Sequence, residues 1–219
     1  MHRAQINGKI QRKKGTIHCA PTIQIKTINL YFRTNDKTGE RELFEILRPK
    51  VYVNSICNID LKKLKKIKKI KGIIVDLDNT LVAWGEKEVS QKIIDWVKEA
   101  KRLEFKLCIV SNTNSKRVAE FEKIFNIPYH SKYFKPFSIA FNNGLKILDT
   151  KKSETVVIGD QIFTDIWGGN RLKLLTILVT PIVKKDSIGT FLHRNLEKIL
   201  ISFWLKKGII KKEIGNWPK

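Results

Sequence analysis

Short apolar runs alternate with amphipathic stretches between residues 72 and 179, and this alternation restricts the fold more than any other feature of the sequence. Short strand-like runs separated by helix-length stretches predict right-handed βαβ units. We therefore expect an α/β fold with a parallel sheet of about five strands and helices on both faces. The expected strands lie at 72–78, 105–112, 127–130, 155–160 and 175–179, and the expected helices at 90–103, 115–125, 137–148 and 161–173.

Polar side chains follow several of these strands at the point where each strand ends. Two aspartates follow the first strand, a serine and an asparagine follow the second, and a lysine lies shortly after the third. The fourth strand ends in a further aspartate, with another soon after it. Ligands of parallel sheets bind at the carboxyl ends of the strands, so one site should contain all of these groups. The expected site residues are Asp76, Asp78, Ser111, Asn112, Lys135, Asp160 and Asp165.

Carboxylates gathered at one edge of a sheet repel one another unless positive charge lies among them. A Mg²⁺ ion supplies that charge well, because it prefers oxygen ligands and commonly retains waters and a phosphate oxygen. Lys135 adds a further positive charge. The sequence therefore predicts a Mg²⁺ site facing a phosphate group, with Asp76, Asp78, Asp160 and Asp165 as candidate ligands.

Four motifs in this order resemble those of the haloacid dehalogenase (HAD) phosphatase superfamily. They are the DLDNT segment at 76–80, Ser111, Lys135 and the GDQIFTD segment at 159–165. The longer stretches around them look like the YqeG group of class III (IIIA) phosphatases, which is related to the phosphatidylglycerophosphate (PGP) phosphatases of mitochondria. The resemblance covers the chain from about residue 45 and implies a Rossmann-like HAD fold.

The resemblance also implies roles for the first motif. Asp76 would be the nucleophile, attacking phosphorus to form an aspartyl-phosphate while also binding the metal. Asp78 would protonate the leaving oxygen and later take a proton from the attacking water.

For the other motifs, the resemblance implies that Ser111 and Asn112 bind or support the phosphate and that Lys135 neutralises charge. Asp160 would bind Mg²⁺, and Asp165 would support the metal or Lys135. Taken singly, these residues have ordinary structural alternatives: Ser111 could cap the following helix and Asp160 could stabilise a turn.

The spacing of the motifs bears on the substrate. A single helix and its turns fill the interval between successive motifs, so the sequence predicts no large cap domain. An open site suits a phosphate carried on something large, such as a lipid headgroup at an interface.

The C-terminal segment predicts an amphipathic helix with flanking lysines. Leu192, Leu196, Ile199 and Phe203 keep helical spacing, and Trp204 widens their stripe. A basic helix of this kind either packs on the sheet as the last helix of the domain or lies in a membrane interface. We expect packing for the apolar face and allow membrane contact for the lysines.

The charge of the chain is strongly positive, with 43 basic and 21 acidic residues and a formal net charge of +22. An excess of this size indicates a polyanionic partner or a lysine-rich proteome. Residues 1–44 are expected to form a basic, poorly ordered extension, and residues 45–219 the phosphatase domain with its C-terminal helix. The three cysteines have neither the spacing of a zinc site nor that of a disulfide framework.

We therefore expect a Mg²⁺-dependent phosphomonoesterase, with PGP as the leading substrate in phospholipid synthesis. The enzyme would be cytoplasmic and peripheral at the inner face of the membrane. Two alternatives remain open: a phosphatase of nucleic-acid ends, phosphoproteins or small metabolites, and a basic RNA- or ribosome-associated protein that uses the HAD scaffold for binding. The pair Asp76 and Asp78 favours an enzyme, since a binding protein has no need of both carboxylates.

Overall fold

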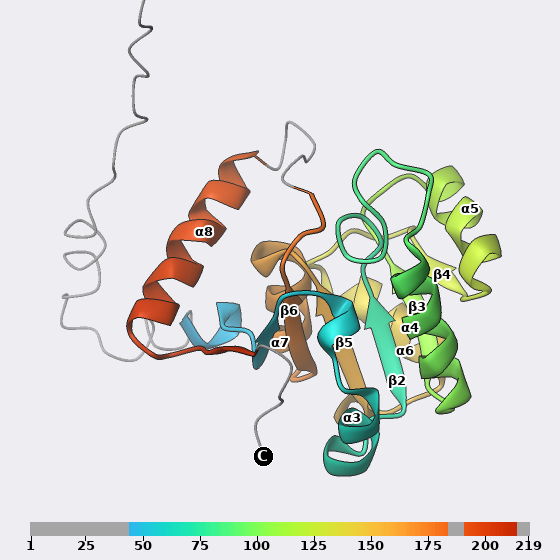
Figure 1. Cartoon of the computed structure of the whole chain (residues 1–219), viewed down its shortest axis with the longest axis horizontal. Helices are drawn as coiled ribbons and strands as arrows, with labels where there is room; N and C mark the ends of the chain where they lie inside the picture. The colour runs from blue at the N-terminus through green and yellow to red at the C-terminus, as the bar shows by residue number, and fades with distance from the viewer. Residues whose placement is uncertain (1–43, 184–190, 214–219) are drawn as a thin grey trace, which may run out of the picture. The chain divides into compact units, whose positions relative to one another are not determined.

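A seven-stranded parallel sheet forms the centre of the molecule, in the strand order β4-β3-β2-β5-β6-β1-β7 (Figure 1). The computed structural model describes residues 44–183 and 191–213. The extension expected at residues 1–44 therefore lies outside the described residues, apart from its last residue. The strands are β1 (Val51–Val53), β2 (Gly72–Val75), β3 (Lys106–Val110), β4 (Tyr129–His130), β5 (Thr155–Gly159), β6 (Leu175–Val179) and β7 (Lys212–Glu213).

The helices follow the strands in the alternation that the sequence predicts. They are α3 (Leu61–Lys68), α4 (Gln91–Arg102), α5 (Ser115–Phe125), α6 (Ser138–Leu148), α7 (Trp167–Arg171) and α8 (Phe191–Lys206). Short turns of helix lie at η1 (Ile56–Asn58), η2 (Lys152–Glu154) and η3 (Ile162–Ile166), of which η3 is a π-helical turn.

The prediction of a parallel α/β fold is confirmed, and all five expected strands form. The sheet also contains β1 and β7, which the sequence analysis did not identify. Both pair in parallel at one edge of the sheet, and they are only three and two residues long. A strand this short has too few residues to display a hydrophobic period.

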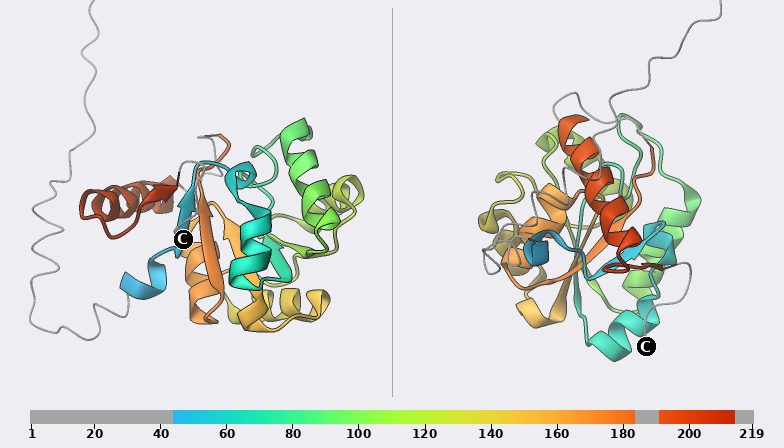
Figure 2. Two further views of the ribbon diagram at one scale, coloured as in Figure 1. Left: turned by 60° about the horizontal axis from the view of Figure 1, so that its bottom comes forward. Right: turned by 90° about the vertical axis from the view of Figure 1, so that its left-hand side faces the viewer.

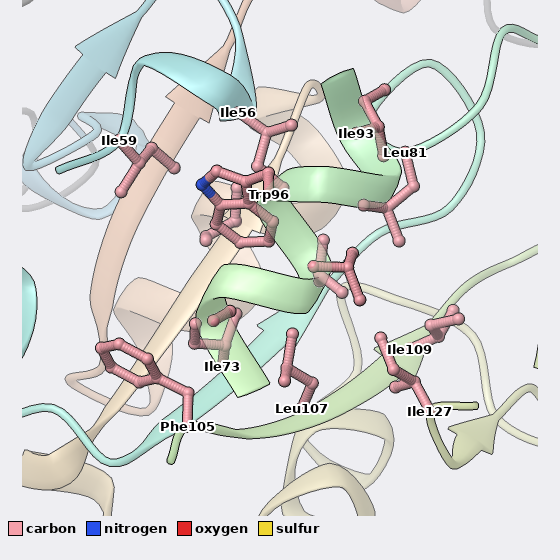
Figure 3. Close-up of a cluster of buried hydrophobic side chains, with 14 of the residues drawn as sticks. Ile56, Ile59, Ile73, Leu81, Ile93, Trp96, Phe105, Leu107, Ile109 and Ile127 are labelled. Carbon is pink, nitrogen blue, oxygen red and sulfur yellow. The ribbon is translucent and has the colours of Figure 1, made fainter. Parts of the chain in front are cut away.

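The two faces of the sheet carry separate hydrophobic clusters, which accounts for the continuous apolar strands. On one face, Ile73 of β2 and Leu107 of β3 pack with α3, α4 and α5. Figure 3 shows Ile93 and Trp96 of α4 in this cluster. On the other face, Ile74 packs against α6 in a second cluster. Because successive residues of a strand point to opposite faces, Ile73 and Ile74 pack in different hydrophobic layers.

The lysine-rich helix α3 begins at a side-chain cap. The carboxylate of Asp60 accepts a hydrogen bond from the Lys63 amide at 3.0 Å and so caps the first turn. Lys69 ends the helix in the left-handed conformation, three residues before β2 begins at Gly72.

Helix α8 packs near the end of the sheet that contains β1 and β7, on the opposite side of the molecule from α4 and α5 (Figures 1 and 2). Trp204 is fully buried against Ile166 of η3 and Leu178 of β6. The expected stripe is rotated, however, because Leu196 is 44% exposed. The apolar face thus packs on the domain as expected, with Trp204 rather than Leu196 as its anchor. Within the described residues, no helix has the length and apolar character that crossing a bilayer requires.

Candidate active site

The order of the strands brings the predicted site residues together. Strands β3, β2 and β5 are neighbours in the sheet, and their carboxyl ends meet at one edge. Asp76 follows β2 directly, Ser111 follows β3 and Asp160 follows β5. The backbone amide of Asp76 donates to the carbonyl of Ile158 at 2.9 Å, which continues the sheet hydrogen bonds up to the site.

Three buried aspartates form the centre of the site. Asp76, Asp160 and Asp165 each direct one carboxylate oxygen to a common region, and these oxygens lie within 4.8 Å of one another. Lys135 reaches into the group and is only 5% exposed. Its ammonium donates to Oδ1 of Asp76 at 2.5 Å and to Oδ1 of Asp165 at 2.7 Å. The lysine therefore neutralises part of the charge that the carboxylates bring into the interior.

Burial governs the protonation of these groups. It raises the pKa of Asp76 to about 7, although Lys135 opposes the shift. It also raises the pKa of Asp160 well above its ordinary value, against the opposing effect of Arg194. For Lys135, burial acts to lower the pKa, but the carboxylates of Asp165 and Asp76 outweigh it and raise the pKa. The buried carboxylates thus bring more negative charge than Lys135 neutralises, and a bound cation would supply the missing positive charge.

The residues present fit a divalent ion with a preference for oxygen. Three carboxylates converge in the interior, and hard cations such as Mg²⁺ bind such sets readily. The ligands would be Asp76, Asp160 and Asp165. The π-helical turn η3 helps to position the last of these, because Oδ2 of Asp165 accepts from the Gln161 amide at 3.1 Å. Such turns are frequent at functional sites.

Asp78 takes a different position from the one expected for a metal ligand. Among the described residues, it lies outside the group of three, although it lines the same cavity. Its Oδ1 accepts from Nε of Arg117 at 2.9 Å, and Nη2 of Arg117 lies 2.8 Å away. The chain turns sharply just after Leu77, and Asn79 has a φ of 63°. Asp76 contacts Lys135, whereas Asp78 contacts Arg117, and metal binding by Asp78 stays a prediction.

Asn112 and Ser111 also line the cavity, and Asn112 contacts the segment that carries Lys135. The Asn112 side chain accepts from the Lys135 amide at 2.7 Å and donates to the Lys135 carbonyl at 3.1 Å. Asn112 therefore fixes the backbone of Lys135 and so helps to position its ammonium group. Ser111 is buried and its hydroxyl oxygen accepts from the Thr113 amide at 3.3 Å, while both residues line the cavity. Their binding to a phosphate stays a prediction.

Two charged residues of α8, which sequence reasoning missed, extend this network. The guanidinium of Arg194 pairs with the carboxylate of Asp160, and Glu197 is buried beside Arg194. Their only signal in the sequence is an Arg-Glu pair three residues apart, which is common on exposed helices. On the sheet side, the Thr80 hydroxyl donates to Oδ1 of Asp160 at 3.2 Å.

A cavity of about 800 Å³ opens above the cluster. Asp76 and Lys135 contribute to its lining, and α8 supplies His193 and Leu196. Apolar side chains form much of the wall, namely Trp84, Phe163, Trp167 and Leu196. The site therefore combines charged groups with an apolar rim.

Removal of the Lys135 charge should destabilise the protein strongly. We expect Lys135→Met to lower the free energy of unfolding by about 3 kcal/mol in the presence of a chelator, because two buried carboxylates lose their shared cation. Added Mg²⁺ should raise the melting temperature of the variant more than that of the wild type. Lys106→Met is the control, since Lys106 pairs with the exposed Asp149 and should contribute under about 1 kcal/mol. Equal melting temperatures of the wild type and Lys135→Met in the presence of a chelator would contradict this account.

Comparison with known proteins identifies a matching family model and several similar proteins. Residues 42–184 match the family model described as mitochondrial PGP phosphatase. The "probable phosphatase YqeG" of Bacillus subtilis (strain 168) is 41% identical over 165 residues, covering 75% of this chain and 95% of that protein. The "phosphatidylglycerophosphate phosphatase 1, chloroplastic/mitochondrial" of Arabidopsis thaliana is 28% identical over 177 residues, covering 75% of this chain and 50% of that protein. A solved structure of a HAD phosphatase from Thermococcus onnurineus aligns with a TM-score of 0.40 at 15% identity, covering 46% of this chain and 51% of that one.

Proposed function

Because the chain belongs to the mitochondrial PGP phosphatase family, we propose that it removes the terminal phosphate of phosphatidylglycerophosphate in phospholipid synthesis. That the chain is a phosphatase follows from the family match and from the relative at 41% identity, as its motifs predict. The observation that best supports a phosphomonoester as substrate is the contact of Lys135, which lines the cavity, with two of the three clustered aspartates.

The proposed reaction begins at the carboxylate of Asp76. One of its oxygens attacks phosphorus, the bond from phosphorus to the leaving oxygen breaks, and Asp78 gives that oxygen a proton. A water molecule then loses a proton to Asp78 and attacks the same phosphorus, which releases phosphate and restores Asp76. Arg117 holds Asp78 in place through its contacts with Oδ1.

The remaining residues bind and orient the phosphate. Lys135 faces Asp76, so its ammonium can offset the charge of the transferring phosphoryl group, and Ser111 is within the same cavity. A bound Mg²⁺ would neutralise phosphoryl charge in this environment. Most of the rate enhancement would then come from position and charge, because the groups are buried and fixed before substrate arrives.

The choice of a lipid substrate is supported by the access to the site. The chain between β2 and β3 forms α4 and the chain between β3 and β4 forms α5, without a large cap domain. Trp84 and Leu196, at 39% and 44% exposure, place apolar surface at the cavity. A glycerophosphate headgroup could reach Asp76 while its acyl chains stay in a membrane, with the lysines of α8 near anionic lipid.

Phosphate release from three substrates tests this proposal. The wild type with Mg²⁺ is assayed on micellar phosphatidylglycerophosphate, p-nitrophenyl phosphate and a 5′-phosphorylated oligonucleotide. We expect kcat/KM to be highest for the lipid. Turnover of p-nitrophenyl phosphate without the lipid would keep the phosphatase and overturn the substrate, and preference for the oligonucleotide would favour nucleic-acid ends. A folded protein that releases no phosphate from any of them would favour a binding role.

A further inference from the structure

Helix α8 brings an arginine into direct contact with a candidate metal ligand. Arg194 Nη1 donates to the backbone carbonyl of Asp160 at 2.8 Å, and Nη2 pairs with Oδ2 of the same residue. Two contacts from one guanidinium fix both the backbone and the side chain of Asp160. With the Thr80 hydroxyl on Oδ1, the carboxylate is held from two sides.

Glu197 holds the arginine in turn. Its Oε2 accepts from Nη1 of Arg194 at 3.3 Å, and its Oε1 accepts from the Phe163 amide at 3.1 Å. The Glu197 residue is 3% exposed, and burial raises its pKa to about 7 against the opposing effect of Arg194. A helix that only covered the sheet would gain more from an apolar residue here. The carboxylate instead connects α8 to η3, the turn that carries Asp165.

The position of Arg194 argues against direct binding of substrate. From α8, His193 and Leu196 line the cavity, whereas the Arg194 side chain is 12% exposed and reaches Asp160 outside that lining. Helix α8 also lies beyond residues 42–184, the part of the chain that the family model matches. Neither the family match nor the four motifs therefore assign a role to this residue.

We propose that Arg194, held by Glu197, is a positioning residue that fixes the Asp160 carboxylate for a divalent cation. Only the identity of the ion in this inference rests on the proposed function. Groups that orient a metal-binding carboxylate commonly affect metal affinity by about 10- to 100-fold. The arginine also brings positive charge to a cation site, but the three carboxylates outnumber the two cations, Lys135 and Arg194. The arginine therefore leaves an excess of carboxylates over cationic groups for the incoming ion.

Metal binding to the full chain, measured without substrate, tests the proposal. Mn²⁺ is the probe, because its free form is quantified by electron paramagnetic resonance. We expect Arg194→Ala to raise the Kd for Mn²⁺ by about tenfold or more. Arg194→Lys should give an intermediate Kd, because a single ammonium cannot hold Asp160 and Glu197 in the same geometry. Glu197→Gln should raise the Kd less than Arg194→Ala, since it keeps an acceptor for the Phe163 amide.

Arg102→Ala is the matched control. Arg102 forms the same type of helical pair, three residues from Glu99, but on the exposed surface of α4. Its removal should leave the Kd for Mn²⁺ unchanged. Should Arg194→Ala fail to fold, Arg194→Lys and Glu197→Gln carry the test.

The outcomes separate this inference from the proposed function. If Arg194→Ala and Arg194→Lys bind Mn²⁺ as tightly as the wild type, or more tightly, Arg194 does not position a ligand, while the phosphatase remains. A loss of melting temperature without a change in Kd would give α8 a purely structural role and overturn the proposal. A wild type that binds no Mn²⁺ would overturn the metal site itself and, with it, the role of Arg194.

Discussion

Replacement of Asp76 by Asn is expected to lower kcat by about 10⁴-fold or more while the protein stays folded. The amide has the size of the carboxylate but cannot attack phosphorus, so the covalent route is closed. Stability without metal should not fall, because burial raises the pKa of Asp76 to about 7 and the charged carboxylate is therefore disfavoured in the folded protein. Lys135 retains its second partner, Asp165, at 2.7 Å.

Asp78→Asn separates the two roles that we assign to the first motif. With p-nitrophenyl phosphate, whose leaving group needs no proton, this variant should release one burst of nitrophenolate per chain and then stall. Asp76→Asn should give no burst, and Asp149→Asn, a change on the exposed surface, should turn over normally. Steady turnover by Asp76→Asn near the wild-type rate would remove Asp76 as the nucleophile.

The second large effect is expected at Gly159, the last residue of β5. A Cβ at this position would lie 2.2 Å from Cγ and Oδ2 of Asp165 and 2.5 Å from its Cβ. Gly159→Ala must therefore displace the whole Asp165 side chain, and with it one carboxylate of the cluster. We expect a loss of about 2 kcal/mol in the free energy of unfolding and a failure to bind Mn²⁺ at concentrations that saturate the wild type.

Gly168→Ala provides a control of equal severity on α7. Its Cβ would lie 2.2 Å from the ring of Phe141, in the hydrophobic cluster under α6. Both variants should unfold at lower temperature, but only Gly159→Ala should lose the metal. Similar losses of Mn²⁺ binding in both variants would mean that metal binding depends on packing in general. That result would contradict the specific role of Asp165.

The central part of the fold could be predicted because its signals are local and repeated. Strands β2, β3 and β5 are apolar on both faces, and the motif residues sit at their ends, so the parallel sheet alone brings Asp76, Ser111 and Asp160 together. The cap of α3 at Asp60 is equally local, since it depends on one side chain and the next turn.

The parts that could not be predicted depend on contacts between distant residues. Asp78 pairs with Arg117 of α5, 39 positions away in the chain, and nothing local in the sequence indicates that pairing. The contact of Arg194 with Asp160 joins residues 34 positions apart in the chain. The rotation of α8 relative to the expected stripe was missed because Trp204 packs against η3 and β6. The sequence of the helix alone does not indicate these contacts.

The place of β1 in the sheet has a consequence for how the protein is made. This strand leaves the ribosome before the other six described strands, yet both of its partners, β6 and β7, follow it late in the chain. The block of β2, β3, β4 and β5 can assemble during synthesis, while β1 waits without a neighbour until residues 175–179 and 212–213 have emerged. Completion of the sheet is therefore a step that follows translation of the C-terminal segment, and it closes the fold by joining the beginning of the described chain to its end.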